Sequence, residues 1–193
     1  MALKIAGHSL PCIIFGLLVQ GSGQMAVGDD GLRDAVAFYT EWVYNVSVIG
    51  PGVAAEEWQA PLFTYIMTNK QFNELNVICR RNGWPPQTNR GITFYPNVIK
   101  HILTSRTGKD SLTWSEVAEI ISAALNSRSA VVLKRDYNQQ VIVLNSVDVL
   151  RIGRTKEKFR GALIVEVSIK DLAPITAYHA NEAKVRTLMK DRG

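Results

Sequence analysis

Apolar residues recur at helical spacing through the first half of the chain. Two aspartates open residues 29–46, and apolar residues follow at intervals of three or four positions, a pattern that predicts an amphipathic helix. Residues 56–84 predict one or two further helices, which Asn82 and Gly83 end. The repeating apolar positions of the first helix are Leu32, Val36, Tyr39 and Val43.

The second half changes from helices to strands. Pro96, a residue tolerated in the first turn, begins a predicted helix that ends at about Thr107. Thr113 and Glu116 have capping-box spacing at the start of a second helix. This order predicts an α+β fold, with a helical N-terminal region and then two helices packed on a four-stranded antiparallel sheet. The later elements are a hairpin in residues 129–145, strands at 161–169 and 175–180, and a last helix from about 181 to 190.

A domain boundary is predicted where the composition and the charge both change. The segment PPQTNRG, residues 85–91, has the prolines, polar residues and glycine typical of a linker. Residues 1–87 hold five Lys and Arg against seven Asp and Glu, a net charge of −2, whereas residues 88–193 hold 17 against 10, a net charge of +7. We therefore expect a mainly helical region in 1–87, of no assigned role, and an α+β domain in 88–193, whose charge suits a phosphate-rich or acidic partner.

Composition narrows the class of protein. At 47% hydrophobic and 20% charged residues, the chain is globular in composition and shows no bias toward disorder or a coiled coil. Cys12 and Cys79 have no metal-ligand spacing between them, so we expect neither a metal site nor a cofactor. Free thiols in a reduced, cytoplasmic compartment are the plainer reading, with one disulfide as the alternative.

An apolar run at residues 9–19 is too short to span a bilayer as a helix. A secretion signal over residues 1–23 is the alternative to a buried strand or helix here, but Pro11 interrupts the run and only Lys4 precedes it.

Four residues form the candidate catalytic set. His101 and Arg106 fall on the helix that begins at Pro96. Thr176 and Tyr178 alternate along the last strand, so they share one face of the sheet. Imidazole is a natural acid or base near neutral pH, and an arginine suits phosphate. Each of them alone also fits an ordinary surface residue.

Basic residues supply a candidate RNA-binding surface. The segment RIGRTKEKFRG, residues 151–161, has five cations against one acid and is predicted to be a loop beside the sheet. Phosphate contacts from such a loop would give affinity for RNA with little specificity for its sequence. The candidate RNA-binding residues are Lys100, Lys134, Arg135, Arg151, Arg154, Lys156, Lys158 and Arg160.

Taken together, the segments IKHILTSRTGKD and ITAYHANEAKV, with two helices followed by four strands, resemble the nuclease superfamily that includes barnase, EndoU, colicin-type tRNases and RelE. The phage-borne and contact-dependent toxin branches are the most similar. The resemblance covers about residues 90–193.

The resemblance implies a metal-independent endoribonuclease, with tRNA among the candidate substrates, that cuts by attack of the ribose 2'-hydroxyl on the adjacent phosphate. By this resemblance His101 is the acid or base, Arg106 binds the phosphate, Thr176 donates to it, and Tyr178 orients the nucleotide or shares in proton transfer. Lys100, Lys134 or Arg135 are alternatives for the phosphate, and His179, expected to face away from Tyr178, is a reserve candidate.

An acidic inhibitor protein is the further partner that the resemblance implies. The alternatives to an enzyme are an RNA-binding module without catalysis and an accessory or structural phage protein. The absence of Gly-rich phosphate loops and of serine or cysteine hydrolase motifs argues against those enzyme classes.

Overall fold

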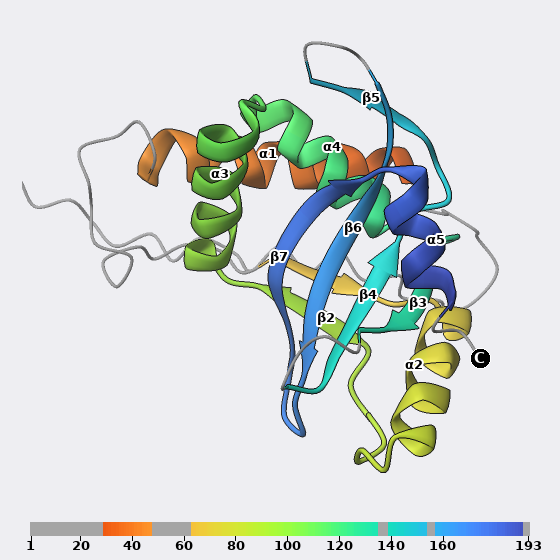
Figure 1. Cartoon of the computed structure of the whole chain (residues 1–193). Coiled ribbons are helices and arrows are strands. Elements are labelled where there is room, and N and C mark those ends of the chain that lie inside the picture. Colours follow the sequence, from red (N-terminus) through yellow and green to blue (C-terminus); the bar gives the residue numbers. More distant parts are fainter. Residues whose placement is uncertain (1–28, 48–62, 135–138, 154–156, 191–193) are drawn as a thin grey trace, which may run out of the picture.

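A computed structural model describes residues 29–47, 63–134, 139–153 and 157–190 of the protein. Helices and strands alternate irregularly along the chain, and the α+β class predicted from the sequence is confirmed (Figure 1). The helices are α1 (Asp29–Ser47), α2 (Asn69–Arg81), α3 (Pro96–Asp110), α4 (Trp114–Ala124) and α5 (Glu182–Lys190). The strands are β1 (Phe63–Ile66), β2 (Gly91–Phe94), β3 (Ala130–Leu133), β4 (Val141–Asn145), β5 (Leu150–Ile152), β6 (Glu157–Val167) and β7 (Leu172–Ala180).

The sheet is larger than the predicted four antiparallel strands. Its order is β1-β2-β7-β6-β4-β3, with β5 paired to β6 alone, and the pair β2–β7 is parallel. The predicted strands correspond to β3, β4, β6 and β7. The segment Phe63–Ile66, expected in a helix, is strand β1, because Phe63 and Tyr65 alternate into the core while the backbone pairs with β2.

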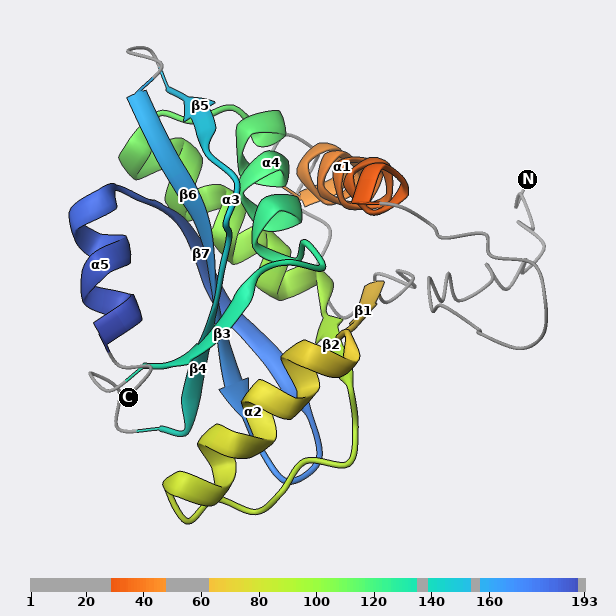
Figure 2. The same cartoon turned by 90° about the vertical axis from the view of Figure 1, so that its right-hand side faces the viewer.

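Two hydrophobic cores lie on opposite faces of this sheet. In Figure 2, α1, α3 and α4 cover one face and α5 covers the other. The main core lies under the three helices and contains residues from both sides of position 87, for example Phe63 and Phe94. The smaller core lies under α5, where Val185 and Leu188 pack toward β-branched residues of β3, β4 and β6.

Local sequence sets the helix ends. Thr68 with Gln71, and Thr113 with Glu116, form reciprocal capping boxes at the starts of α2 and α4. Helix α3 begins with Pro96 in its first turn and ends at Ser111, whose φ of 53° is left-handed. These ends fix where the side chains of α3 approach β7.

The register of β6 and β7 decides which side chains face which core. Gly161 lies opposite His179, and a Cβ on Gly161 would meet the backbone of α4. His179 therefore points to the α4 face, and Tyr178 points to the α5 face, where it packs against the smaller core. The described pairing of β2 with β7 is at Leu172. The later part of β7 is thus an edge at which side chains from both faces meet.

Candidate functional site

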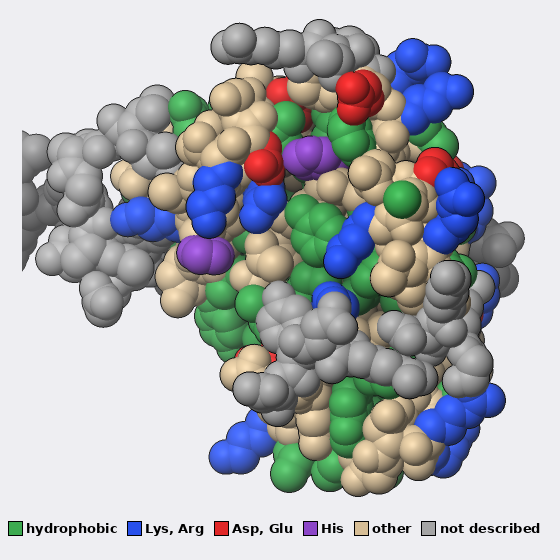
Figure 3. Space-filling view, in the orientation of Figure 1, with side chains coloured by type: hydrophobic (Ala, Val, Ile, Leu, Met, Phe, Trp, Pro, Cys, Tyr) green, Lys and Arg blue, Asp and Glu red, His purple; other side chains and the backbone are tan. Residues whose placement is uncertain are grey.

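A shallow hollow of about 560 Å³ lies at this edge of β7. Figure 3 shows Lys, Arg and His side chains gathered over the region between α3 and α5. We call this site the basic hollow because it holds three cations and one carboxylate. The residues that line it are Arg106, Asp110, Lys134, Ile164, Tyr178, His179 and Lys184.

Arg106 is held in place by its own helix. Its Nη1 donates to Asp110 Oδ2 at 2.7 Å, one turn further along α3, and its side chain is 19% exposed. Among the described residues its Nε has no hydrogen-bond partner. A guanidinium has five N–H donors in a planar fork. The Nε is buried, so the donors on Nη1 and Nη2 that Asp110 does not use are the candidates for contact with a bound anion.

Two lysines reach the same hollow from other elements. Lys134 follows β3 and is only 9% exposed, and its backbone N–H donates to the carbonyl of Val141, which extends the β3–β4 ladder. Lys184 is exposed in the first turn of α5. Because these residues and Arg106 come from three separate elements, the positive charge at the hollow is created by the fold. An anion such as phosphate is the ligand that this charge favours.

Tyr178 and His179 bring a hydroxyl and an imidazole, both groups that can exchange protons, to the lining of the hollow, and the Tyr178 Oη atom itself is buried. The His179 ring packs edge-to-face against Phe159, with centroids 4.6 Å apart and an interplanar angle of 80°. Its Nδ1 is buried and has no hydrogen-bond partner in the described part of the chain. Phe159, and not a hydrogen bond at Nδ1, therefore positions the imidazole.

The structure brings together part of the predicted catalytic set. Arg106 and Tyr178 line the basic hollow, and so does Lys134 from the predicted RNA-binding set. His101 is exposed on α3 and is not among the described residues that line the hollow. Thr176 is half-buried on β7, opposite the hollow residue Ile164, and does not itself line it. His179, and not His101, is the histidine that lines the hollow. Strand alternation puts His179 and Tyr178 on opposite faces of the sheet, and both reach the hollow because this part of β7 lies at an edge.

The predicted basic loop is instead largely a two-stranded ribbon. Arg151 on β5 lies directly opposite Lys158 on β6, and both are exposed. Like charges directly opposite each other destabilise a sheet slightly, and a polyanion would relieve this repulsion. Arg160 is used within the fold, where its Nε donates to Glu182 at 3.2 Å.

The remaining predicted cations fall into two groups. Lys100 is half-buried on α3 and is not among the described residues lining the basic hollow. Arg135, Arg154 and Lys156 lie outside the described residues.

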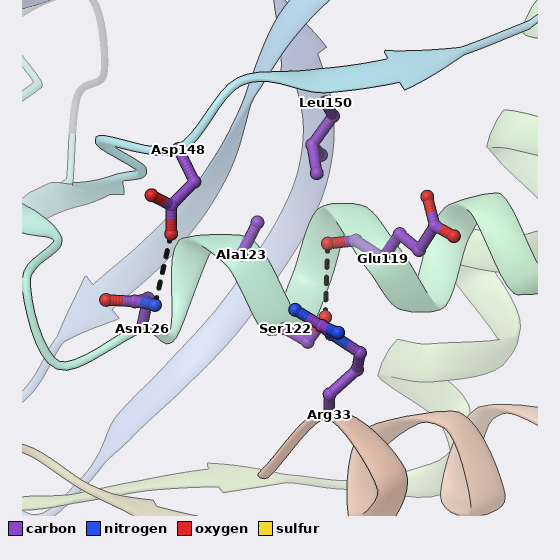
Figure 4. Close-up of a pocket in the computed structure, with 7 residues that line it drawn as sticks. All are labelled: Arg33, Glu119, Ser122, Ala123, Asn126, Asp148 and Leu150. Atoms are coloured by element: carbon purple, nitrogen blue, oxygen red, sulfur yellow. Dashed lines mark hydrogen bonds between the residues drawn. The ribbon is translucent and has the colours of Figure 1, made fainter. Parts of the chain in front are cut away.

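A different hollow, of about 260 Å³, lies between α1 and α4 (Figure 4). Its polar groups are largely used within the protein: Asp148 accepts from Asn126 at 3.2 Å and from Arg128 at 2.7 and 3.0 Å. Ser122 donates to the carbonyl of Glu119. It holds no histidine among its described lining residues, so the basic hollow is the better candidate site.

In the described residues, no group of three or more His, Cys, Asp and Glu side chains is placed to hold a metal ion. None of the described helices is both long and apolar enough to cross a bilayer. No protein-family model, curated protein or solved structure matches the chain.

Proposed function

We propose that the basic hollow binds a phosphate of RNA and that the chain cleaves the RNA beside it without a metal ion. The observation that carries the proposal is the convergence of three cations, from α3, from α5 and from the residue after β3, on a hollow that Tyr178 and His179 also line. The resemblance of residues 90–193 to toxin-type ribonucleases points to the same chemistry.

The reaction needs two proton transfers and stabilisation of charge on phosphorus. The 2'-hydroxyl loses its proton as its oxygen bonds to phosphorus, and the bond from phosphorus to the 5'-oxygen breaks as that oxygen gains a proton. The products are a 2',3'-cyclic phosphate and a free 5'-hydroxyl. In this proposal His179 and Tyr178 exchange the protons, while Arg106, Lys134 and Lys184 stabilise the negative charge.

RNA binding without cleavage is the second candidate. The exposed position of His101, away from the described lining of the hollow, favours it, because the hollow then has His179 as its one described imidazole. In either case an acidic inhibitor protein would bind the same cations.

The test is cleavage of a labelled RNA in the presence of EDTA. We expect His179→Asn to lower the cleavage rate about 100-fold or more, as the loss of a general acid or base does, and His101→Asn to leave it within about twofold. The variant Arg81→Ala, at an exposed position on α2, is the control for lost surface charge. RNA that is bound but intact would establish the second candidate, and equal rates for wild type and His179→Asn would refute the assigned chemistry.

A further inference from the structure

We infer that a second, apolar hollow beside the basic hollow binds the nucleobase attached to the phosphate, so that the substrate is recognised as a nucleotide and not as a bare phosphodiester. This inference rests on the proposed phosphate site. The apolar hollow has a volume of about 280 Å³. It is lined by Ser111, Leu112, Ile152, Gly153 and Phe159, together with Asp110 and His179.

The two hollows are neighbours. Asp110 and His179 line both of them, so they form the boundary between the basic part and the apolar part. A ligand held across this boundary has to be anionic at one end and flat or apolar at the other. A nucleotide has this arrangement, because its phosphate and its base are joined through one sugar.

The apolar hollow offers a surface for stacking. Leu112 and Ile152 are buried at 5% and 1% exposure and form its floor. The half-buried Phe159 lines it, with its ring fixed against His179 at 80°. An aromatic ring stacks on any base with a gain that is tolerant of sequence.

Two of the residues that line the apolar hollow have a left-handed backbone conformation. Ser111 and Gly153, on opposite segments, both adopt positive φ, 53° and 74°. Ser111 is the C-cap residue of α3, and Gly153 directly follows β5. Besides His179, the polar side chains that line this hollow are those of Ser111 and Asp110. A carboxylate only accepts hydrogen bonds, so it favours a base edge that offers N–H donors.

The experiment compares ligands that differ only in whether they carry a base or a phosphate. Binding of ribose 5-phosphate, the four nucleoside 5'-monophosphates and the four nucleosides to the full chain is measured by calorimetry or by NMR titration. We expect at least one nucleoside monophosphate to bind about 5- to 150-fold more tightly than ribose 5-phosphate, the range that one stacked base contributes. The variant Phe159→Leu keeps an apolar side chain and should lose most of this preference, whereas Phe159→Tyr should keep it.

Phe38→Leu is the matched control, because Phe38 is 63% exposed on α1 and lines neither hollow among the described residues. Equal affinity for ribose 5-phosphate and all four monophosphates would overturn the base site and leave the phosphate site standing. A preference that survives Phe159→Leu would also overturn it. Nucleosides that bind in a Phe159-dependent way, with no gain from a phosphate, would support the base site and refute the basic hollow as a phosphate site.

Discussion

Replacement of Gly161 by alanine should destabilise the protein, because β6 and α4 are packed too closely there to admit a side chain. An ideal Cβ on Gly161 would lie 2.4 Å from the carbonyl oxygen of Ile120 and 3.2 Å from the backbone N of Ala124. Both atoms belong to the backbone of α4. A rotamer change therefore cannot relieve the clash, and the helix or the strand has to move.

The magnitude follows from that distance. Ordinary contacts between non-bonded atoms lie near 3.5 Å, so the two backbones must separate by about 1 Å. Overpacking of this kind costs about 1–3 kcal/mol, and backbone contact puts this site at the upper end. Replacing a strand glycine by alanine otherwise raises the free energy of unfolding by about 0.5–1 kcal/mol. We expect a net loss of about 2 kcal/mol in the free energy of unfolding, or about 4–8 °C in Tm for a domain of this size.

Urea denaturation at 25 °C, followed by circular dichroism, measures the change. Gly108→Ala is the matched control: Gly108 lies within α3, nothing is within 4 Å of its Cβ position, and the helix should gain about 0.5–1 kcal/mol. A Gly161→Ala protein as stable as the wild type would refute the packing of α4 on β6 described above. It would also remove the basis for placing His179, opposite Gly161, on the α4 face.

Two further perturbations test the interior. Gln71 is fully buried and accepts a hydrogen bond from the Tyr65 hydroxyl at 2.8 Å. Gln71→Leu should lower the free energy of unfolding, measured by urea denaturation, by about 2–3 kcal/mol, because the polar partners of Gln71 lose their hydrogen bonds. An unchanged free energy of unfolding would contradict this network. Burial raises the pKa of the Cys79 thiol, so its contribution to stability is complete below the ordinary thiol pKa and is lost as pH rises through the raised value. We expect the free energy of unfolding of Cys79→Ala to fall less between pH 8 and pH 10 than that of the wild type. We also expect the thiol of the folded protein to react with a disulfide reagent far more slowly than the thiol of the urea-unfolded protein. Equal labelling rates would contradict the burial of Cys79.

Local signals in the sequence were sufficient for much of the fold. The capping box of Thr113 and Glu116, Pro96 in a first turn, and the apolar periodicity of α1 predict elements that the structure confirms. The strands β3, β4, β6 and β7 follow from β-branched runs. Strands β1 and β2 are four residues each, and unlike the equally short β3 they are not followed directly by their partner strand in a hairpin. Their pairing depends on partners far along the chain, as does the parallel contact of β2 with β7.

The candidate site was predictable only in part, for a similar reason. Arg106 and Tyr178 could be selected by residue type and spacing, and both line the basic hollow. Alternation along a strand correctly separates His179 from Tyr178, but it does not reveal that β7 is an edge where both faces are open. Lys184 lies on a helix whose position over the sheet is set by the smaller core, which no local pattern specifies.

The central claim is that the cations of the basic hollow hold RNA phosphate, and the salt dependence of RNA binding tests it most directly. The dissociation constant of a single-stranded RNA is measured between 50 and 300 mM KCl for the wild type, Lys184→Ala and Arg81→Ala, all in EDTA and with a 2'-deoxy substitution to prevent cleavage. Each phosphate contact that is lost should reduce the slope of log K against log salt by about 0.7. The account predicts this reduction for Lys184→Ala and none for Arg81→Ala, and the same slope for all three proteins would contradict it.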